Sequence, residues 1–133
     1  MKRFLTAIIL FCITGFAAPA VAEELFHGEW KQIFSNAGAC ANCQVTIRQN
    51  GASLEILANN DWTAIAEARD RQTAIGAGLW KHGTPRTYAG RTFDIRLWHT
   101  GYDELVMTMR VETATGKPQT IKALFTRVEQ LKI

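Results

Sequence analysis

The chain lacks three motifs that commonly identify an enzyme: a Gly-x-Ser-x-Gly elbow, a glycine-rich phosphate loop and a His-Glu-x-x-His helix. Its carboxylates, among them Glu55, Glu67, Asp94 and Glu112, are scattered over positions that we expect to face solvent. A solvated charged surface explains them. The sequence therefore predicts a protein that is not an enzyme, with catalysis by residues that only the fold brings together as the remaining alternative.

A concentrated basic region is also absent. The chain has 15 Lys and Arg against 12 Asp and Glu. Without residues 1–22, which contain Lys2 and Arg3, 13 basic residues remain against the same 12 acidic ones. A surface that binds nucleic acid or an anionic membrane needs a clustered basic excess, so the sequence excludes both as expected partners.

No apolar run is long enough for a stable membrane span. The longest, Phe4 to Phe16, holds 13 residues, whereas a spanning helix needs about 20. It follows Lys2 and Arg3 and precedes Ala20-Val21-Ala22, which is the pattern of a cleavable secretory signal peptide. We expect cleavage after residue 22, a single domain over residues 23–133, and a periplasmic or secreted location. An uncleaved anchor is the alternative.

Cysteine is scarce, with three residues in the chain. Cys12 lies inside the apolar run and would leave with the signal peptide. Cys40 and Cys43 remain, in the sequence CANC, and an exported protein is expected to oxidise them to a disulfide. Redox activity is the alternative, but a reactive Cys-x-x-Cys normally begins a helix, and this pair leads into a predicted strand.

Metal ligands are few as well. Two cysteines do not complete a zinc site, and His27, His82 and His99 show no ligand spacing. Each histidine lies at a predicted strand end near a tryptophan, so we interpret all three as solvated residues at a rim. No metal and no cofactor is predicted.

What the chain does contain after residue 23 is alternation of apolar and polar residues with period two. Asn50-Gly51 between two such runs predicts a type I′ hairpin turn. A short helix over residues 61–71 competes with the fourth strand. The expected strands are Gly28–Phe34, Cys43–Gln49, Ala52–Ala58, Trp62–Ala68, Thr73–Lys81, Arg91–His99, Glu104–Thr113 and Thr120–Glu129.

These runs average about 14 residues with their connections, which suits antiparallel hairpins and leaves no room for parallel crossovers. Eight such strands in sequence order predict an all-β, antiparallel up-and-down β-barrel, because closure removes the exposed edges of an open sheet. A β-sandwich is the alternative fold.

Gly28-Glu29-Trp30 opens the first expected strand, and Arg127, in ALFTRVE, lies near the end of the last. This pair resembles the calycin superfamily of lipocalins, avidins and some bacterial protease inhibitors. The resemblance implies that the Trp30 indole plugs one end of the barrel and that Arg127 packs across it. A guanidinium over an indole gains about 0.5 to 2 kcal/mol.

The same resemblance implies a lipocalin-like binding protein for a small, partly apolar molecule. Ala64, Ala66 and Ala68 share one face of a strand and could leave a cavity opposite larger side chains, although large residues could equally fill that space. The sequence does not decide whether the Trp80 side chain faces the interior or the solvent. The candidate binding residues are Trp62, Trp80, Arg86, Tyr88 and Trp98.

A protein-interaction module, such as an inhibitor of an envelope or secreted hydrolase, is the alternative function. Its surface would be the loop that contains Arg86 and Tyr88, extended by Trp98, because interfaces favour Trp, Tyr and Arg. The interior distinguishes the two: a cavity of about 300 Å³ or more favours a small ligand, and a filled interior with exposed aromatic residues favours a protein partner.

Overall fold

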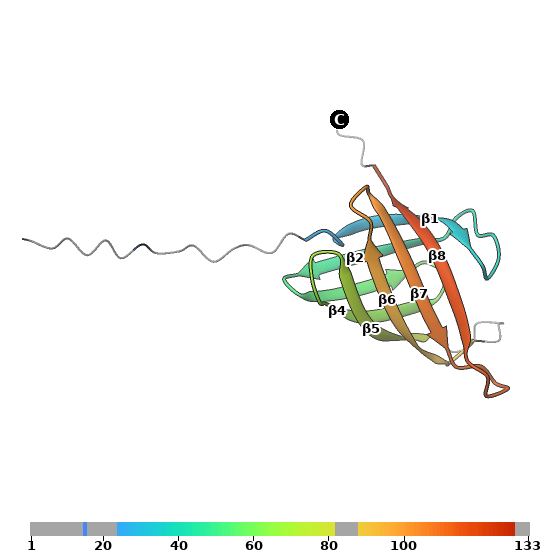
Figure 1. The fold of residues 1–133 in the computed structure, drawn as a ribbon. Coiled ribbons are helices and arrows are strands. Elements are labelled where there is room, and N and C mark those ends of the chain that lie inside the picture. Colours follow the sequence, from blue (N-terminus) through green and yellow to red (C-terminus); the bar gives the residue numbers. More distant parts are fainter. Residues whose placement is uncertain (1–14, 16–23, 82–87, 130–133) are drawn as a thin grey trace, which may run out of the picture.

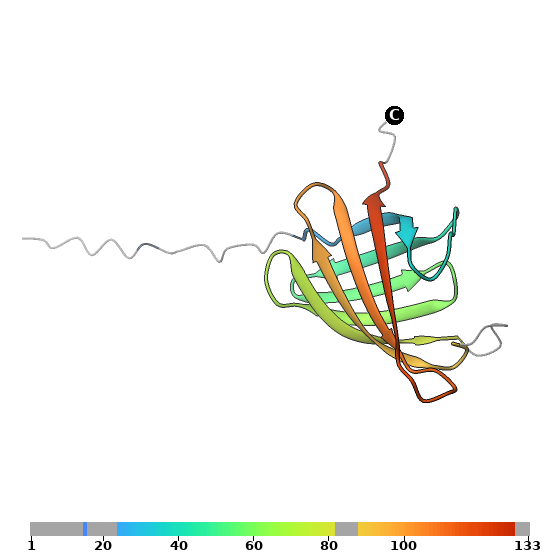
Figure 2. The ribbon, with the colours of Figure 1, turned by 45° about the vertical axis from the view of Figure 1, so that its right-hand side comes forward.

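A computed structural model describes residue 15, residues 24–81 and residues 88–129. Within these residues the chain forms eight antiparallel strands, which close into a barrel in sequence order (Figures 1 and 2). The strands are β1 (Gly28–Ser35), β2 (Gln44–Asn50), β3 (Ser53–Ala58), β4 (Trp62–Ala68), β5 (Thr73–Trp80), β6 (Thr92–His99), β7 (Glu104–Val111) and β8 (Gln119–Arg127).

The predicted strands are confirmed, with ends that shift by at most two residues. The competing helix over residues 61–71 is wrong, because Trp62–Ala68 is the strand β4. The β-sandwich is also excluded, since β1 pairs with both β2 and β8 and so leaves the sheet without an edge. Barrel closure satisfies the backbone groups that an edge strand would expose.

Strand β6 shows why alternation produces this wall. Phe93, Ile95 and Leu97 are buried, and Asp94 and Arg96 between them are exposed. Successive side chains of a strand point to opposite faces, so one face enters the barrel and the other meets water. Burying an aliphatic or aromatic side chain of this size contributes about 1.5 to 3 kcal/mol.

The β2–β3 turn corrects one prediction. Asn50 still pairs with Ser53 as part of the ladder, so the two turn residues are Gly51 and Ala52. Only Gly51 has a positive φ, of 61°, and a single positive φ at the first turn position is the pattern of type II′. The predicted hairpin is present, but its turn type is not I′.

The small residues of β4 and β5 do not leave a hollow beside them. Gly78 faces the interior, and a Cβ atom at this position would lie 2.3 Å from the ring of Phe93. Ala64 pairs with Gly78 in the next strand, so this part of the wall is thin where Phe93 packs against it. Large side chains therefore fill the interior opposite the small ones here. Trp80 lies two residues after Gly78 along β5, so it also faces inward, where it is buried.

Candidate functional site

The two ends of the barrel are built differently. The closed end is formed by residues 24–27 with the β2–β3, β4–β5 and β6–β7 turns, and it lies to the left in Figure 1. The open end carries the β1–β2 connection (residues 36–43), the β3–β4 turn and the β7–β8 connection. Trp62 and Trp80, paired across β4 and β5, lie at the open end.

Trp30 is buried at the closed end, where the resemblance to calycin barrels implies a plugging indole. Its side chain is 0% exposed, and its indole Nε1 donates a hydrogen bond to the carbonyl oxygen of Phe26 over 2.9 Å. The guanidinium carbon of Arg127 lies 4.2 Å from the centre of the Trp30 ring. The indole is thus both buried and hydrogen-bonded, and Arg127 covers it.

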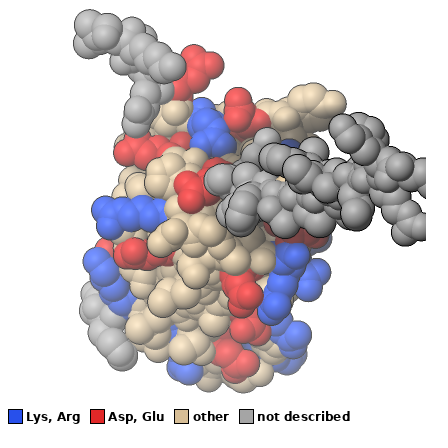
Figure 3. All heavy atoms as spheres, turned by 90° about the vertical axis from the view of Figure 1, so that its left-hand side faces the viewer, with Lys and Arg blue, Asp and Glu red and all other residues tan. Residues whose placement is uncertain are grey.

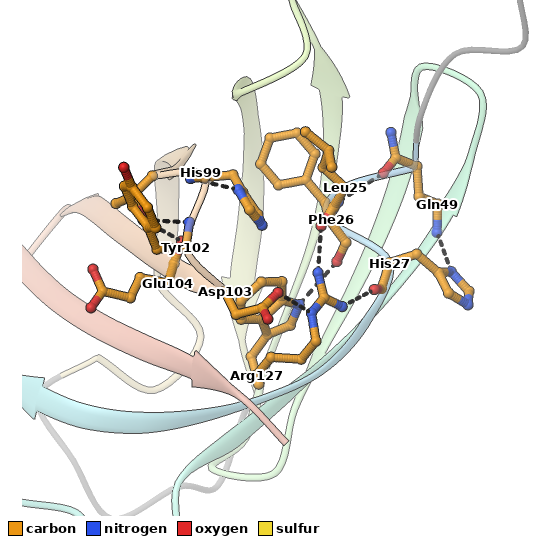
Figure 4. Close-up of polar contacts among 12 residues, drawn as sticks. Leu25, Phe26, His27, Gln49, His99, Tyr102, Asp103, Glu104 and Arg127 are labelled. Atoms are coloured by element: carbon orange, nitrogen blue, oxygen red, sulfur yellow. Dashed lines mark hydrogen bonds and ion pairs between the residues drawn. The ribbon is translucent and has the colours of Figure 1, made fainter. Parts of the chain in front are cut away.

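Arg127 also fastens the segment before β1 to the barrel (Figure 4). Its Nη1 donates to the carbonyl of His27 over 2.6 Å, and its Nη2 donates to the carbonyl of Leu25 over 2.8 Å. Nε contacts the Asp103 carboxylate at 3.0 Å. A Cβ at Gly28 would lie 2.6 Å from Nη1, and Gly28 has a φ of 136°, so glycine is required beside the guanidinium.

His99 corrects the interpretation of the histidines as solvated. It is 3% exposed, and its ring packs edge-on against Phe26 and Trp30, with ring centres 6.3 and 5.7 Å apart. Burial lowers the pKa of His99, the charge of Arg127 lowers it further, and Asp103 acts in the opposite direction. Alternation along β6 puts His99 on the face of Leu97, which is the signal that the earlier interpretation missed.

The histidine ring is also held in one tautomer. The backbone N–H of Gly101 donates to His99 Nδ1 over 3.0 Å, so the ring proton is on Nε2. Among the described residues Nε2 has no hydrogen-bond partner.

His27 differs from His99, because it is exposed and its Nδ1 accepts a hydrogen bond from the Gln49 backbone. His82 lies outside the described residues.

A pocket of about 150 Å³ lies at the open end. Its walls are the rings of Trp62, Trp80 and Tyr88, apolar side chains of β7 and β8 such as Met109, and residues of the 35–43 segment. The centres of the Trp80 and Tyr88 rings are 5.6 Å apart, and those of Trp62 and Trp80 are 6.3 Å apart. This volume is half of the roughly 300 Å³ that would favour a small ligand, so by volume the described interior is closer to the filled barrel of a protein-binding module, and the pocket has room for a compact group alone.

The polar groups around this pocket are neutral. Gln32, Ser35 and Asn60 contribute uncharged side chains, and no Asp, Glu, Lys, Arg or His is among the described lining residues. Tyr88 Oη already donates to Gln119 Oε1 over 2.5 Å. Trp80 Nε1 is buried and has no hydrogen-bond partner within the described part of the chain.

The Cys40–Cys43 disulfide is present, as predicted, with Cα atoms 5.4 Å apart. Both cysteines line the pocket, and Cys43 is buried immediately before β2. The bond closes a short turn in which the Cys43 N–H donates to the Cys40 carbonyl. Its position at the mouth indicates that it shapes the pocket wall.

The structure brings together three of the five predicted binding residues, Trp62, Trp80 and Tyr88. Trp98 is separate from them: it is 51% exposed on the outer face of β6, next to His99 and therefore near the closed end. Arg86 lies outside the described residues. The sequence reasoning missed Gln32, although it shares the inward parity of Trp30 along β1.

Trp98 instead begins a row of outward apolar side chains across four strands. In register it pairs with Val106, Val106 pairs with Leu124, and Leu124 pairs with Phe34. Phe34 is 61% exposed, beside a β-bulge in β1. These four residues, here called the outer apolar row, cross β6, β7, β8 and β1.

Charge is mixed on the closed-end side of the molecule, where acidic and basic side chains are interspersed (Figure 3). Across residues 24–81 and 88–129, no group of three or more His, Cys, Asp or Glu side chains could hold a metal ion. The described residues contain no helix of the length and apolarity needed to cross a membrane.

No protein-family model matches the chain, and no curated protein matches it in sequence. Fold and site geometry therefore define its class. It is a closed, antiparallel up-and-down barrel that is plugged at one end by an arginine-covered tryptophan and has an aromatic-walled pocket at the other.

Proposed function

We propose that the protein is a calycin-like barrel, not an enzyme, that binds a small, partly apolar ligand at its open end. The closed topology and the Trp30–Arg127 contact support the calycin-like assignment. The observation that carries the binding function is the pocket between Trp62, Trp80 and Tyr88, because concave sites with aromatic walls and a few polar groups are the usual places for small molecules.

The pocket limits the size of the bound group. A cavity of about 150 Å³ holds a benzene-sized ring, and drug-sized ligands use about 300 Å³ or more. The ligand is therefore a compact molecule, or a larger one that inserts a single compact group and leaves the rest outside the mouth.

The proposal includes export. Residues 1–22 would be removed as a signal peptide, and residues 23–133 would work in the periplasm or outside the cell. The Cys40–Cys43 disulfide supports this location, because structural disulfides persist in oxidising compartments.

Two probes of one ring each, acetophenone and isopropylbenzene, test the pocket directly. Each is titrated alone into the oxidised protein while backbone amides are followed by ¹H–¹⁵N NMR. We expect saturable shifts at Cys43, Trp80 and Tyr88. The variant Ile121→Phe adds a ring inside the pocket and should abolish the shifts, whereas Thr108→Phe, which adds one on the outer face of β7, should leave them. Absence of binding by both probes would reject the proposed function.

The outer apolar row supports a second candidate, a protein-interaction module such as an inhibitor of an envelope hydrolase. Exposed aromatic side chains such as Trp98 and Phe34 are frequent in interface centres. Inhibition assays on secreted and envelope proteases and glycosidases would test it, with Trp98→Ser as the variant and Tyr102→Ser as the control. Equal behaviour of the two variants, or no inhibition by the unmodified protein, would reject this candidate.

A further inference from the structure

Trp80 is the one pocket residue whose buried polar atom has no partner among the described residues. Its indole nitrogen can only donate a hydrogen bond. Buried donors in folded proteins are nearly always paired, because an unpaired one loses its bonds to water and gains nothing in return, at a cost of about 1 to 3 kcal/mol. The atom has almost no accessible surface in the free protein, so a ligand's acceptor reaches it when the Trp80 ring turns its nitrogen toward the pocket, and the new hydrogen bond would then remove this penalty.

The other hydrogen-bond donors of the described residues at the mouth either have a protein partner or are accessible to water. The Tyr88 hydroxyl donates to Gln119, and the Ser35 hydroxyl, which accepts from the Ala37 backbone, is only partly buried, so its own O–H can donate to water. Gln32 and Asn60 are only partly buried, so water can satisfy their amides. Trp80 Nε1 is thus the donor that a bound molecule would change most.

The charge of the lining sets a second condition. None of the described side chains around the pocket is ionised. An anion or cation placed against Trp62, Met109 and Ile121 would lose hydration without gaining an opposite charge, and burial of an unpaired charge is far more costly than burial of a neutral polar group. The described lining therefore offers no compensation to a charged ligand.

We propose that the ligand is an uncharged, compact apolar molecule with a hydrogen-bond acceptor, such as a carbonyl or ether oxygen, that accepts the Trp80 Nε1–H. This inference rests on the proposed binding function of the open end and specifies the chemical class of its ligand. Apolar contact with the pocket rings supplies most of the affinity, and the acceptor supplies selectivity.

Three probes with the same nine-heavy-atom skeleton test it: acetophenone is neutral with an acceptor, isopropylbenzene has no acceptor, and benzoate is charged. Dissociation constants are measured by NMR titration for the unmodified protein and for Trp80→Phe, which keeps a ring and removes the donor. We expect Trp80→Phe to weaken acetophenone by about three- to tenfold, the range of one neutral hydrogen bond. Isopropylbenzene should change by less than about twofold, since the ring contact remains.

Comparing each probe across the two proteins cancels the different water affinities of the probes. Benzoate should bind the unmodified protein at least about tenfold more weakly than acetophenone. Trp62→Phe is the matched variant and should affect acetophenone and isopropylbenzene equally. If Trp80→Phe also weakens both equally, or if benzoate binds as well as acetophenone, the inference is wrong while the binding function stands. If no probe shifts the pocket amides, both are wrong.

Discussion

The closed and open ends of the barrel each contain a buried tryptophan, and they treat its polar atom in opposite ways. Trp30 Nε1 donates to the Phe26 carbonyl over 2.9 Å, whereas Trp80 Nε1 has no partner among the described residues. Arg127 covers Trp30 and donates to two backbone carbonyls. The chain itself pairs the indole donor of the closed end, although His99 Nε2 beside it has no partner among the described residues, and it leaves the indole donor of the open end unpaired.

The same contrast appears in the packing. At the closed end the His99 ring contacts both Phe26 and Trp30 edge-on, and all three side chains are buried. At the open end, Trp62, Trp80 and Tyr88 border a pocket of about 150 Å³. Tight packing of large side chains contributes most to stability, and a pocket lacks the contacts that its walls would otherwise make. Stability should therefore depend more on the closed end, and binding on the open end.

Removal of the plug should produce the largest effect. We expect Trp30→Ala to lower the free energy of unfolding by about 3 to 5 kcal/mol, because it opens a cavity and leaves the Phe26 carbonyl and Arg127 without the indole. Urea titration followed by circular dichroism measures the change.

Trp98→Ala is the matched control, since it removes the same side chain from the outer face, where it is 51% exposed. It should cost less than about 1 kcal/mol. A loss below 1 kcal/mol for Trp30→Ala, or equal losses for the two variants, would show that Trp30 does not plug the barrel.

The closed end was also the more predictable one. Strand order follows from period-two alternation, and the contact between Trp30 and Arg127 is implied by the resemblance to calycin barrels. Alternation alone even places His99 inward beside Leu97, although proximity to a strand end suggested a solvated residue. These features depend on local sequence, because side-chain direction in a strand is fixed by residue parity.

The pocket could not be read from the sequence in the same way. Phe93 packs over Gly78 and against the rings of Trp62 and Trp80, which line the pocket, and another part of the wall depends on where the disulfide turn at Cys40 and Cys43 folds. Trp98 illustrates the limit. Its exposure follows from parity, but its distance from Tyr88 depends on the direction of β6, which places Trp98 near the closed end.

The contrast in hydrogen bonding can be isolated by a pair of conservative variants. Trp30→Phe and Trp80→Phe both replace a buried indole by a phenyl ring, but only the first breaks a hydrogen bond. We expect Trp30→Phe to destabilise the protein by about 1 kcal/mol more than Trp80→Phe. The reason is that Trp30→Phe removes one hydrogen bond and leaves the Phe26 carbonyl without its donor.

Urea titrations of both variants without ligand measure the difference. Equal losses would mean that Trp80 Nε1 is as well satisfied as Trp30 Nε1 in the free protein. That result would also remove the reason for assigning an acceptor to the ligand.

The closed end carries one further consequence, which concerns pH. His99 is neutral when buried, accepts a hydrogen bond from the Gly101 N–H at Nδ1, and faces the positive charge of Arg127, with Asp103 as the opposing carboxylate. Protonation at Nδ1 would break that bond and place a second positive charge beside Arg127. Its pKa is therefore lower in the folded protein than in the unfolded chain, where it lies near 6.5.

Above about pH 6.5 the histidine is neutral in both states and the shift has no effect on stability. As pH falls below this value the unfolded chain takes up the proton first, so stability decreases, by at most about 1.4 kcal/mol per pH unit for one proton. We expect the unmodified protein to lose stability relative to His99→Gln as the pH is lowered from 8 to 5.5. Urea titrations of both proteins at each pH measure the difference in unfolding free energy. The two proteins differ only at residue 99, and a difference that stays constant over this range would show that His99 is as accessible to water when folded as when unfolded.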